Sequence, residues 1–265
     1  MQIYDYLFWL FLYSFFGWIY ESTLCSITEK KFVNRGFLSG PICPIYGCGA
    51  VAVIFCLSSL KSTVAIFIVG MLLTCSVEYI TSWLLEKIFN ARWWDYTHYK
   101  INLNGRVCLL GAIVFGTFAT VLLKYIHPKI QEITLRIPAP ILMGSVSLVV
   151  CLAVGDCTVT VIHILKLKGK LAEIQIAMNA FVHESYSRAK DLKETLHENF
   201  ERSKFYNKRI QELVENANMH EKRLLNAFPR LKSLYYNEAL EHFKYKRKKA
   251  LNKFKELRRN NSHSL

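Results

Sequence analysis

Five stretches of this chain are apolar over about the length of a membrane crossing, and this feature restricts its fold more than any other. A helix needs about 20 apolar residues to cross about 30 Å of hydrocarbon. The stretches are residues 3–20, 44–60, 64–85, 107–125 and 141–165. They predict an all-α, polytopic membrane protein of about five transmembrane helices. Pro and Gly crowd the start of the second stretch, which leaves open whether it crosses fully or begins as a re-entrant segment.

The net charge of +14 is distributed unevenly along the 265 residues. Residues 1–165 contain 11 Lys or Arg and 8 Asp or Glu, whereas residues 166–265 contain 23 Lys or Arg and 12 Asp or Glu. We therefore expect a transmembrane domain at 1–165 and a basic cytoplasmic helical tail at 166–265.

Apolar residues recur at helical spacing in the tail, which predicts a helical hairpin or coiled coil with a break near Pro229. The stripes include Leu171, Ile174 and Met178, then Leu192, Leu196 and Phe200, then Leu240 and Phe243. A homo-oligomer could form through them. The basic end of the tail favours anionic membrane lipid as a partner. Nucleic acid is disfavoured, because no recognised binding module accompanies the charge.

Lys and Arg also predict the orientation, because short cytoplasmic loops are rich in them. The connections at 21–42 and 87–107 carry such residues, and so does the tail. We therefore place the N-terminus outside, the tail in the cytoplasm and an external loop at 127–139. The chain is then a multi-pass protein of the cell membrane, with two hairpins of the same orientation followed by one further helix.

The two predicted hairpins contain similar polar clusters. Glu21 precedes Asn34-Arg35-Gly36, and Glu78 and Glu86 precede Asn104-Gly105-Arg106. A bilayer excludes charge and irregular backbone unless protein or water covers them. The repeated cluster therefore indicates a site, although two short patches of Asn, Gly and Arg can also resemble each other by chance.

Three separated motifs carry a resemblance to a known family. They are Phe15-Phe-Gly-Trp18-Ile-Tyr-Glu21, the run from Asn34 to Gly47, and Trp93-Trp-Asp-Tyr96 leading into Asn102-Leu-Asn-Gly-Arg106. Over about residues 1–160 the chain resembles the family catalogued as putative ABC-transporter type IV permeases of Gram-positive bacteria. The resemblance implies a membrane subunit of a transporter. Because the chain lacks the Gly-rich loop ending in Gly-Lys-Ser/Thr that holds ATP phosphates, ATP-driven activity would need a separate ATPase subunit.

An Arg beside Gly and Pro residues with accessible backbone N–H groups suits an anionic headgroup, phosphate or carboxylate. The predicted substrate-binding residues are Glu21, Asn34, Arg35, Gly36, Gly40, Pro41, Tyr46, Glu78, Glu86, Trp94, Asp95, Asn104 and Arg106. Arg35 could instead be an anchor at the membrane surface. Glu78 could form a structural ion pair with Arg35 or Arg106, or take a substrate or proton role. The aromatic residues at 93–99 favour a belt in the headgroup layer.

No arrangement of nucleophile, acid and base points to an enzyme, and we expect no catalytic residue, metal or cofactor. Cys43 and Cys48 have the wrong spacing for a zinc site. The leading interpretation is a permease-like membrane subunit with an anion-binding site on its cytoplasmic face. The alternative is a membrane-embedded enzyme or lipid-binding scaffold that acts on a headgroup through the same loops.

Overall fold

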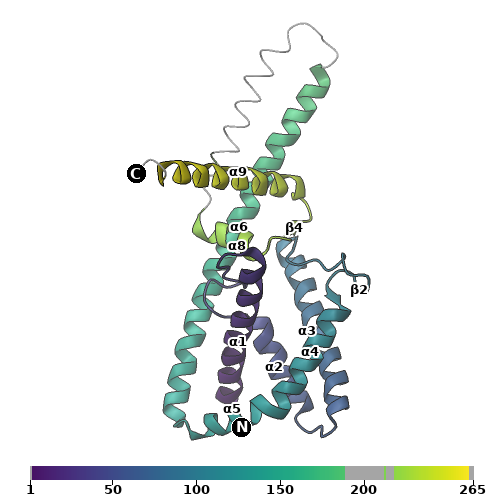
Figure 1. Ribbon diagram of the computed structural model, residues 1–265, viewed down its shortest axis with the longest axis vertical. Helices are drawn as coiled ribbons and strands as arrows, with labels where there is room; N and C mark the ends of the chain where they lie inside the picture. Colours follow the sequence, from purple (N-terminus) through teal and green to yellow (C-terminus); the bar gives the residue numbers. More distant parts are fainter. Residues whose placement is uncertain (1, 189–211, 213–217, 263–265) are drawn as a thin grey trace. The chain divides into compact units, whose positions relative to one another are not determined.

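The computed structural model describes residues 2–188, 212 and 218–262, and the chain is mainly helical, as predicted (Figure 1). The helices are α1 (Ile3–Glu29), α2 (Pro44–Leu57), α3 (Thr63–Phe89), α4 (Leu109–Val121), the π-helical turn η1 (Leu122–Ile126), α5 (His127–Arg136), α6 (Ala139–Arg188), α8 (Met219–Ala227) and α9 (Asn237–Ser262). Strands of two residues each lie in the connections: β1 (Ala91–Arg92), β2 (Asn102–Leu103), β3 (Val107–Cys108) and β4 (Lys232–Ser233).

The residues fall into two compact units. The first comprises Met1–Ile162 and Asn226–Leu231, and the second comprises His163–Leu225 and Lys232–Leu265. Helix α6 contributes its beginning to the first unit and its later turns to the second. Both polar loops of the predicted site belong to the first unit.

Three helical runs in the described part of the chain have the length and apolar composition to cross a membrane. They are Thr63–Phe89, the continuous run Leu109–Arg136, and Ala139–Ile176 within α6. Helix α2 is apolar but has only 14 residues. Helix α1 has 27 residues and is rich in Tyr and Trp, which favour the membrane interface. These helices are those of a membrane protein, and the count of five crossings stays a prediction.

The prediction that residues 127–139 form a loop is wrong, because His127–Arg136 forms helix α5, whereas their external location stays a prediction. Pro128 has no backbone N–H with which to continue the α-helical ladder of α4, and the π-helical turn η1 lies directly before this interruption. Helix α5 is also bonded to α1, because Trp9 Nε1 donates to Thr134 Oγ1 at 3.0 Å. The chain therefore continues as a bent helix where the sequence suggested a loop.

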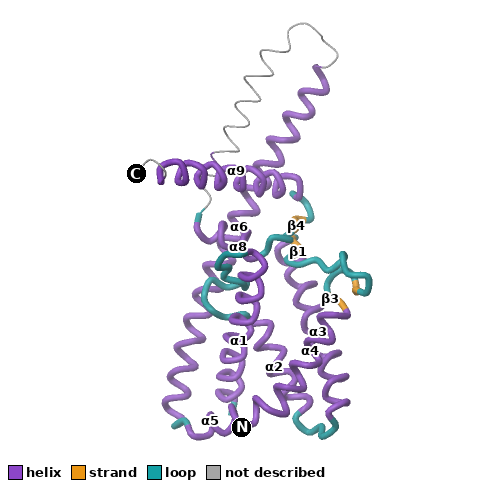
Figure 2. Tube along the Cα trace, viewed as in Figure 1, coloured by secondary structure: helices purple, strands orange, loops and turns teal. Residues whose placement is uncertain are grey.

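Glycine residues allow the two helices of each hairpin to pack closely. In the first hairpin, a Cβ on Gly17 or Gly47 would collide with the facing helix. In the second, a Cβ on Gly70 would lie 2.6 Å from the Cβ of Ala119. Small residues permit such close packing of apolar helices. Both hairpins thus use the same means of closure, and their polar loops lie at the same end of the helices (Figure 2).

The second unit combines the later turns of α6 with α8 and α9. Its buried apolar residues are Ile164, Leu167, Leu171 and Ile174 of α6, Leu224 and Leu225 of α8, and Ala239, Leu240 and Phe243 of α9. Lys170 of α6 pairs with the fully buried Glu221 of α8 at 2.7 Å. Asn218 caps α8, because its side chain accepts from the Glu221 N–H and Glu221 accepts from the Asn218 N–H.

The tail predictions are tested only in part. Helix α8 ends at Ala227 and is followed by non-helical residues at Pro229, so the break is confirmed. The coiled coil stays a prediction, because the stripe formed by Leu192, Leu196 and Phe200 lies outside the described residues.

Candidate functional site

The first hairpin has an ion pair at its loop end. Arg35 lies in the extended segment between α1 and α2, and its Nε is 3.4 Å from Oε2 of Glu21 in α1. The Tyr46 hydroxyl of α2 donates to the other carboxylate oxygen of Glu21 at 2.6 Å. One carboxylate therefore joins the loop and both helices of the hairpin.

Hydroxyl groups on α1 fix the backbone of the same loop. Ser22 Oγ accepts from the N–H of Arg35 at 3.1 Å, and Ser26 Oγ accepts from the N–H of Val33 at 2.9 Å. Because Ser22 and Ser26 are one helical turn apart, they hold the extended segment against a single face of α1. Arg35 is positioned by this contact as well as by its ion pair.

Asn34 has a structural role in the loop. Its Oδ1 accepts from Trp18 Nε1 at 2.7 Å, and its Nδ2 donates to the carbonyl of Ser39 at 2.7 Å. Gly36 is buried with φ +141°, a backbone conformation that side chains with a Cβ rarely adopt. In the motif Asn34-Arg35-Gly36, Asn34 and Gly36 therefore stabilise the backbone conformation of the loop.

Asp156 of α6 binds the Gly/Pro part of this loop. The backbone N–H groups of Ser39 and Gly40 donate to its two carboxylate oxygens at 3.1 and 2.7 Å. Pro41, next to them, is exposed. The N–H groups that we expected to be available to an external anion thus bind an internal one. Asp156 is not among the predicted substrate-binding residues, although its position within an apolar stretch marks it in the sequence as a charge that needs a partner.

The second hairpin repeats the ion pair with different loop geometry. Arg106 Nη2 lies 3.1 Å from Oε2 of Glu86 in α3, and Arg92 Nε lies 3.1 Å from the same oxygen. Arg106 Nη1 also donates to Ser82 Oγ at 3.3 Å. Its guanidinium carbon is 5.5 Å from the centre of the Tyr79 ring. Arg106 is only 7% exposed, so these contacts form a mainly buried network.

A tight turn between β2 and β3 presents Arg106 to α3. The strands pair in antiparallel register, with Leu103 opposite Val107. Asn104 is exposed and donates to the Tyr79 hydroxyl at 2.9 Å. Gly105 has φ +68°, and a Cβ there would lie 2.8 Å from an oxygen of the buried Asp95.

Trp94 and Asp95 also support this turn. Trp94 Nε1 donates to the Arg106 carbonyl at 3.0 Å. Asp95 Oδ1 accepts from the Thr97 N–H at 3.0 Å. Trp94, Asp95 and Asn104 therefore lie in the predicted site, but their observed contacts are with the chain itself.

Glu78 has a different environment from the other two glutamates. It is 6% exposed and accepts from the Tyr96 hydroxyl at 3.2 Å. Within the described part of the chain no Lys, Arg or His side chain forms an ion pair with it, so the suggested pairing with Arg35 or Arg106 is wrong. Burial raises the pKa of Tyr96, and the nearby carboxylates of Glu78 and Glu21 raise it further.

Glu78, Ser82 and Glu86 share one face of α3, because they are spaced by four residues. Arg106 bonds to the second and third of them. Along its length, this α3 face therefore presents a carboxylate that is hydrogen-bonded to Tyr96, a hydroxyl, and a carboxylate that is ion-paired with Arg106.

The two loops meet through aromatic side chains. The Phe37 ring of the first loop lies 5.8 Å from that of Phe89 and 5.2 Å from that of Trp93. Trp93 is 4% exposed. The Trp93 ring packs on Phe37 and the Tyr96 hydroxyl donates to Glu78, so both side chains contact other residues of the unit. The interfacial belt expected at 93–99 stays a prediction.

The segment Asn226–Leu231, distant in sequence, belongs to the same unit and covers Arg35. The Ala227 carbonyl accepts from Arg35 Nη1. The Phe228 ring lies beneath the guanidinium, 4.9 Å from its carbon, and also 4.9 Å from the ring of Trp93. Sequence reasoning did not assign this segment to the site, and only its break at Pro229 was noted.

Two buried donors in the second loop have no hydrogen-bond partner among the described residues. They are Arg106 Nε and Trp93 Nε1. Buried polar groups are nearly always paired, so these two donors are exceptions among the buried groups of the loop.

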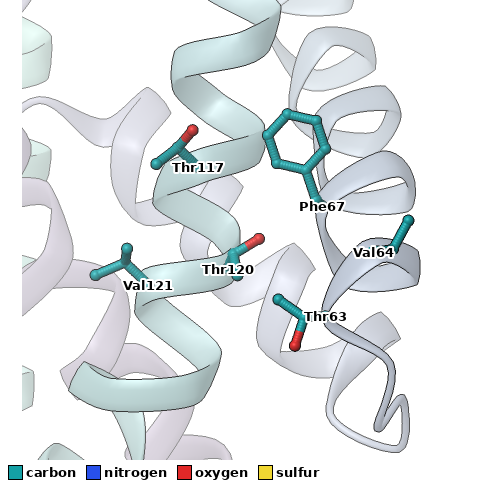
Figure 3. Close-up of a pocket in the computed structure, with 6 residues that line it drawn as sticks. All are labelled: Thr63, Val64, Phe67, Thr117, Thr120 and Val121. Atoms are coloured by element: carbon teal, nitrogen blue, oxygen red, sulfur yellow. The ribbon is translucent and has the colours of Figure 1, made fainter.

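Other parts of the unit provide weaker indications of a site. Burial raises the pKa of the Cys43 thiol to about 12, with Glu21 adding to the rise, so this thiol is a poor nucleophile. No cluster of metal-ligating side chains occurs among the residues that the structure describes. A cavity of about 270 Å³ lies between α3 and α4 at the ends opposite the polar loops (Figure 3). It is lined by Thr63, Val64, Phe67, Thr117, Thr120 and Val121, none of which is a predicted site residue.

Comparison with known proteins identifies one family. The family model described as "Putative ABC-transporter type IV" matches residues 8–161. Neither a curated protein nor a solved structure matches the chain. The matched region contains both hairpins, both ion pairs and Asp156.

Proposed function

Because the chain belongs to the family of putative ABC-transporter type IV proteins, we propose that it is the membrane-embedded subunit of a transporter whose substrate site lies at the loop ends of the two hairpins. The site faces the cytoplasm in this proposal and binds an anionic group. The predicted substrate-binding residues surround it, with Arg35 and Arg106 as the cationic groups.

The unpaired hydrogen-bond donors of the second loop are the observation that most directly supports an anionic ligand. Arg106 Nε and Trp93 Nε1 are buried and lack acceptors among the described residues. Phosphate and carboxylate groups supply acceptor oxygens, and hydrogen bonds from Arg to them are charge-assisted. A cationic ligand would leave both donors unpaired.

Arg35 is the second residue that contacts the anion in this proposal. To bind it, the anion has to replace one of its present partners. Glu21, the Ala227 carbonyl and the Phe228 ring occupy its guanidinium. A substrate oxygen would take the position of the Ala227 carbonyl, since that acceptor is neutral and belongs to a segment outside the hairpin. Binding at Arg35 is thus coupled to displacement of Asn226–Leu231.

Energy for transport would come from a separate subunit. The sequence contains no Gly-Lys-Ser/Thr phosphate loop. The family assignment makes an ATPase the natural partner, and the loops at the cytoplasmic end are the surfaces we propose for its docking.

Mass spectrometry of the purified protein tests the anion site. The full chain is released from detergent or nanodiscs under native conditions, and bound species are identified. We expect an anionic metabolite or lipid on the wild type, lost in Arg106→Gln and weakened in Arg35→Lys, which keeps the charge but not the planar fork. Arg136→Gln is the control, because Arg136 is exposed and pairs only with Glu132 in the contacts observed. No bound anion in the wild type, or equal loss in the control, would contradict the proposal.

The same experiment distinguishes the proposed transporter subunit from the alternative, an enzyme or lipid-binding scaffold. If the bound species is a lipid and the purified protein alone converts its headgroup, the loops form an enzyme site. If the lipid is retained unchanged and no ATPase associates with the protein, a lipid-binding scaffold is the better description.

A further inference from the structure

Three glutamates lie along the loop ends of the hairpins, and they differ in how their charge is balanced. Glu21 pairs with Arg35, and Glu86 pairs with Arg92 and Arg106. Glu78 is the most buried of the three, and its observed partner is the neutral hydroxyl of Tyr96. It also lies within Thr63–Phe89, a helix with the length and composition to cross a membrane.

Among the residues that the structure describes, the groups that act on Glu78 carry no positive charge to compensate it. Its own helix supplies Cys75, and the second loop supplies Tyr96. From α1, Glu21 is close enough to act on both Glu78 and Tyr96. Arg106 of the second loop contacts the same face of α3, but it bonds to Ser82 one turn from Glu78 and to Glu86 two turns away.

A buried carboxylate without a counter-charge is strongly disfavoured in its ionised form, and a second carboxylate nearby disfavours it further. Protonation removes this penalty and leaves a neutral acid that the Tyr96 hydroxyl can still bond. We propose that Glu78 is a proton-binding site, occupied by a proton when its side chain has the contacts described above. The proton resides on Oε2, because Oε1 already accepts from Tyr96.

We assign the proton on Glu78 a role in transport, which is to couple its binding to that of the anion. This role rests on the proposed transport function. An anion bound at Arg106 adds negative charge one helical turn from Glu78, so it favours the proton on Glu78. By linkage, the proton favours the anion to the same extent. Arg92, Arg106 and Glu86 together carry a net charge of +1. The site is therefore neutral when Glu78 is protonated and a singly charged anion is bound, which lowers the cost of enclosing both in the protein.

Infrared spectroscopy of the full chain in lipid nanodiscs tests the proton directly. A protonated carboxylic acid has a carbonyl stretching band that an ionised carboxylate lacks. We expect this band at neutral pH in the wild type, reduced in Glu78→Gln and retained in Glu86→Gln, since Glu86 is ion-paired. In Tyr96→Phe the band should remain and move to higher frequency, because its carbonyl loses a hydrogen bond.

Absence of the band in the wild type, or an unchanged band in Glu78→Gln, would overturn the proposal. Glu78→Asp is a control for a folding defect in Glu78→Gln. Because it keeps a carboxylic acid at this position, the acid band should persist in Glu78→Asp. The measurement needs no substrate. A failed proton test therefore leaves the anion site standing, and failure to detect a bound anion leaves the proton site standing.

Discussion

Both steric restrictions and ionic contacts position single residues of the second loop. Gly105 sits at φ +68° against Asp95, in the turn that delivers Arg106 to α3. The short motif Asn104-Gly105-Arg106 therefore combines a conformational requirement with a chemical one. The sequence predicted the importance of the motif, but it could not separate these two contributions, because the contact with Asp95 depends on the folded path of the loop.

Replacing Gly105 should destabilise the protein through this turn. Gly105→Ala forces a Cβ into the left-handed region and 2.8 Å from an Asp95 oxygen, and such strain costs about 1–3 kcal/mol. Thermal unfolding of the purified chain should show the loss. Gly144→Ala is the matched control, since nothing lies within 4 Å of its added Cβ in α6, and Ala there should be neutral or stabilising by up to about 1 kcal/mol. Equal effects of the two substitutions would argue against a strained turn.

At the scale of helices and loops, the ion pairs of the two polar loops form within their own hairpins. The sequence predicted that the arginines approach the glutamates, and it could not say which pairs form, because Glu21–Arg35 and Glu86–Arg106 have different separations in the chain. The structure places each Arg with a Glu of the same hairpin. The helices themselves were predictable from apolar length, whereas the bend at η1 and the role of Asp156 depend on tertiary contacts.

Charge exchange can test whether the pairs are confined to their hairpins. Glu86→Arg should destabilise the protein by about 3 kcal/mol, because it places a third cation beside the mainly buried Arg106 and Arg92. Adding Arg106→Glu should restore much of the loss, whereas adding Arg35→Glu should not. Unfolding of the single and double variants by heat measures this. Rescue by the Arg35 change would instead indicate pairing between hairpins.

At the scale of the whole molecule, the orientation in the membrane is the prediction that most affects the proposed site. The Lys and Arg distribution places both polar loops in the cytoplasm. The structure puts these loops at one end of the helices and the connection between α2 and α3 at the other. The two ends should therefore face opposite sides of the membrane.

Cysteine labelling in intact cells measures this orientation. In a background without the eight native cysteines, Ser59→Cys should react with a membrane-impermeant thiol reagent, and Lys100→Cys should react only after the cells are opened. Both positions are exposed, so burial does not bias the comparison. The opposite pattern would place the polar loops, and the anion site with them, outside the cell.

The contact between Arg35 and the Ala227 carbonyl can form only late in the synthesis of the chain. Its two residues are 192 positions apart in the chain. The ribosome therefore releases the first hairpin long before it makes the segment that covers Arg35. During that interval the arginine has Glu21 but neither the carbonyl nor the Phe228 ring, and the polar end of the nascent protein is open to water or lipid headgroups. A segment that is translated late thus completes a structure begun by an earlier one.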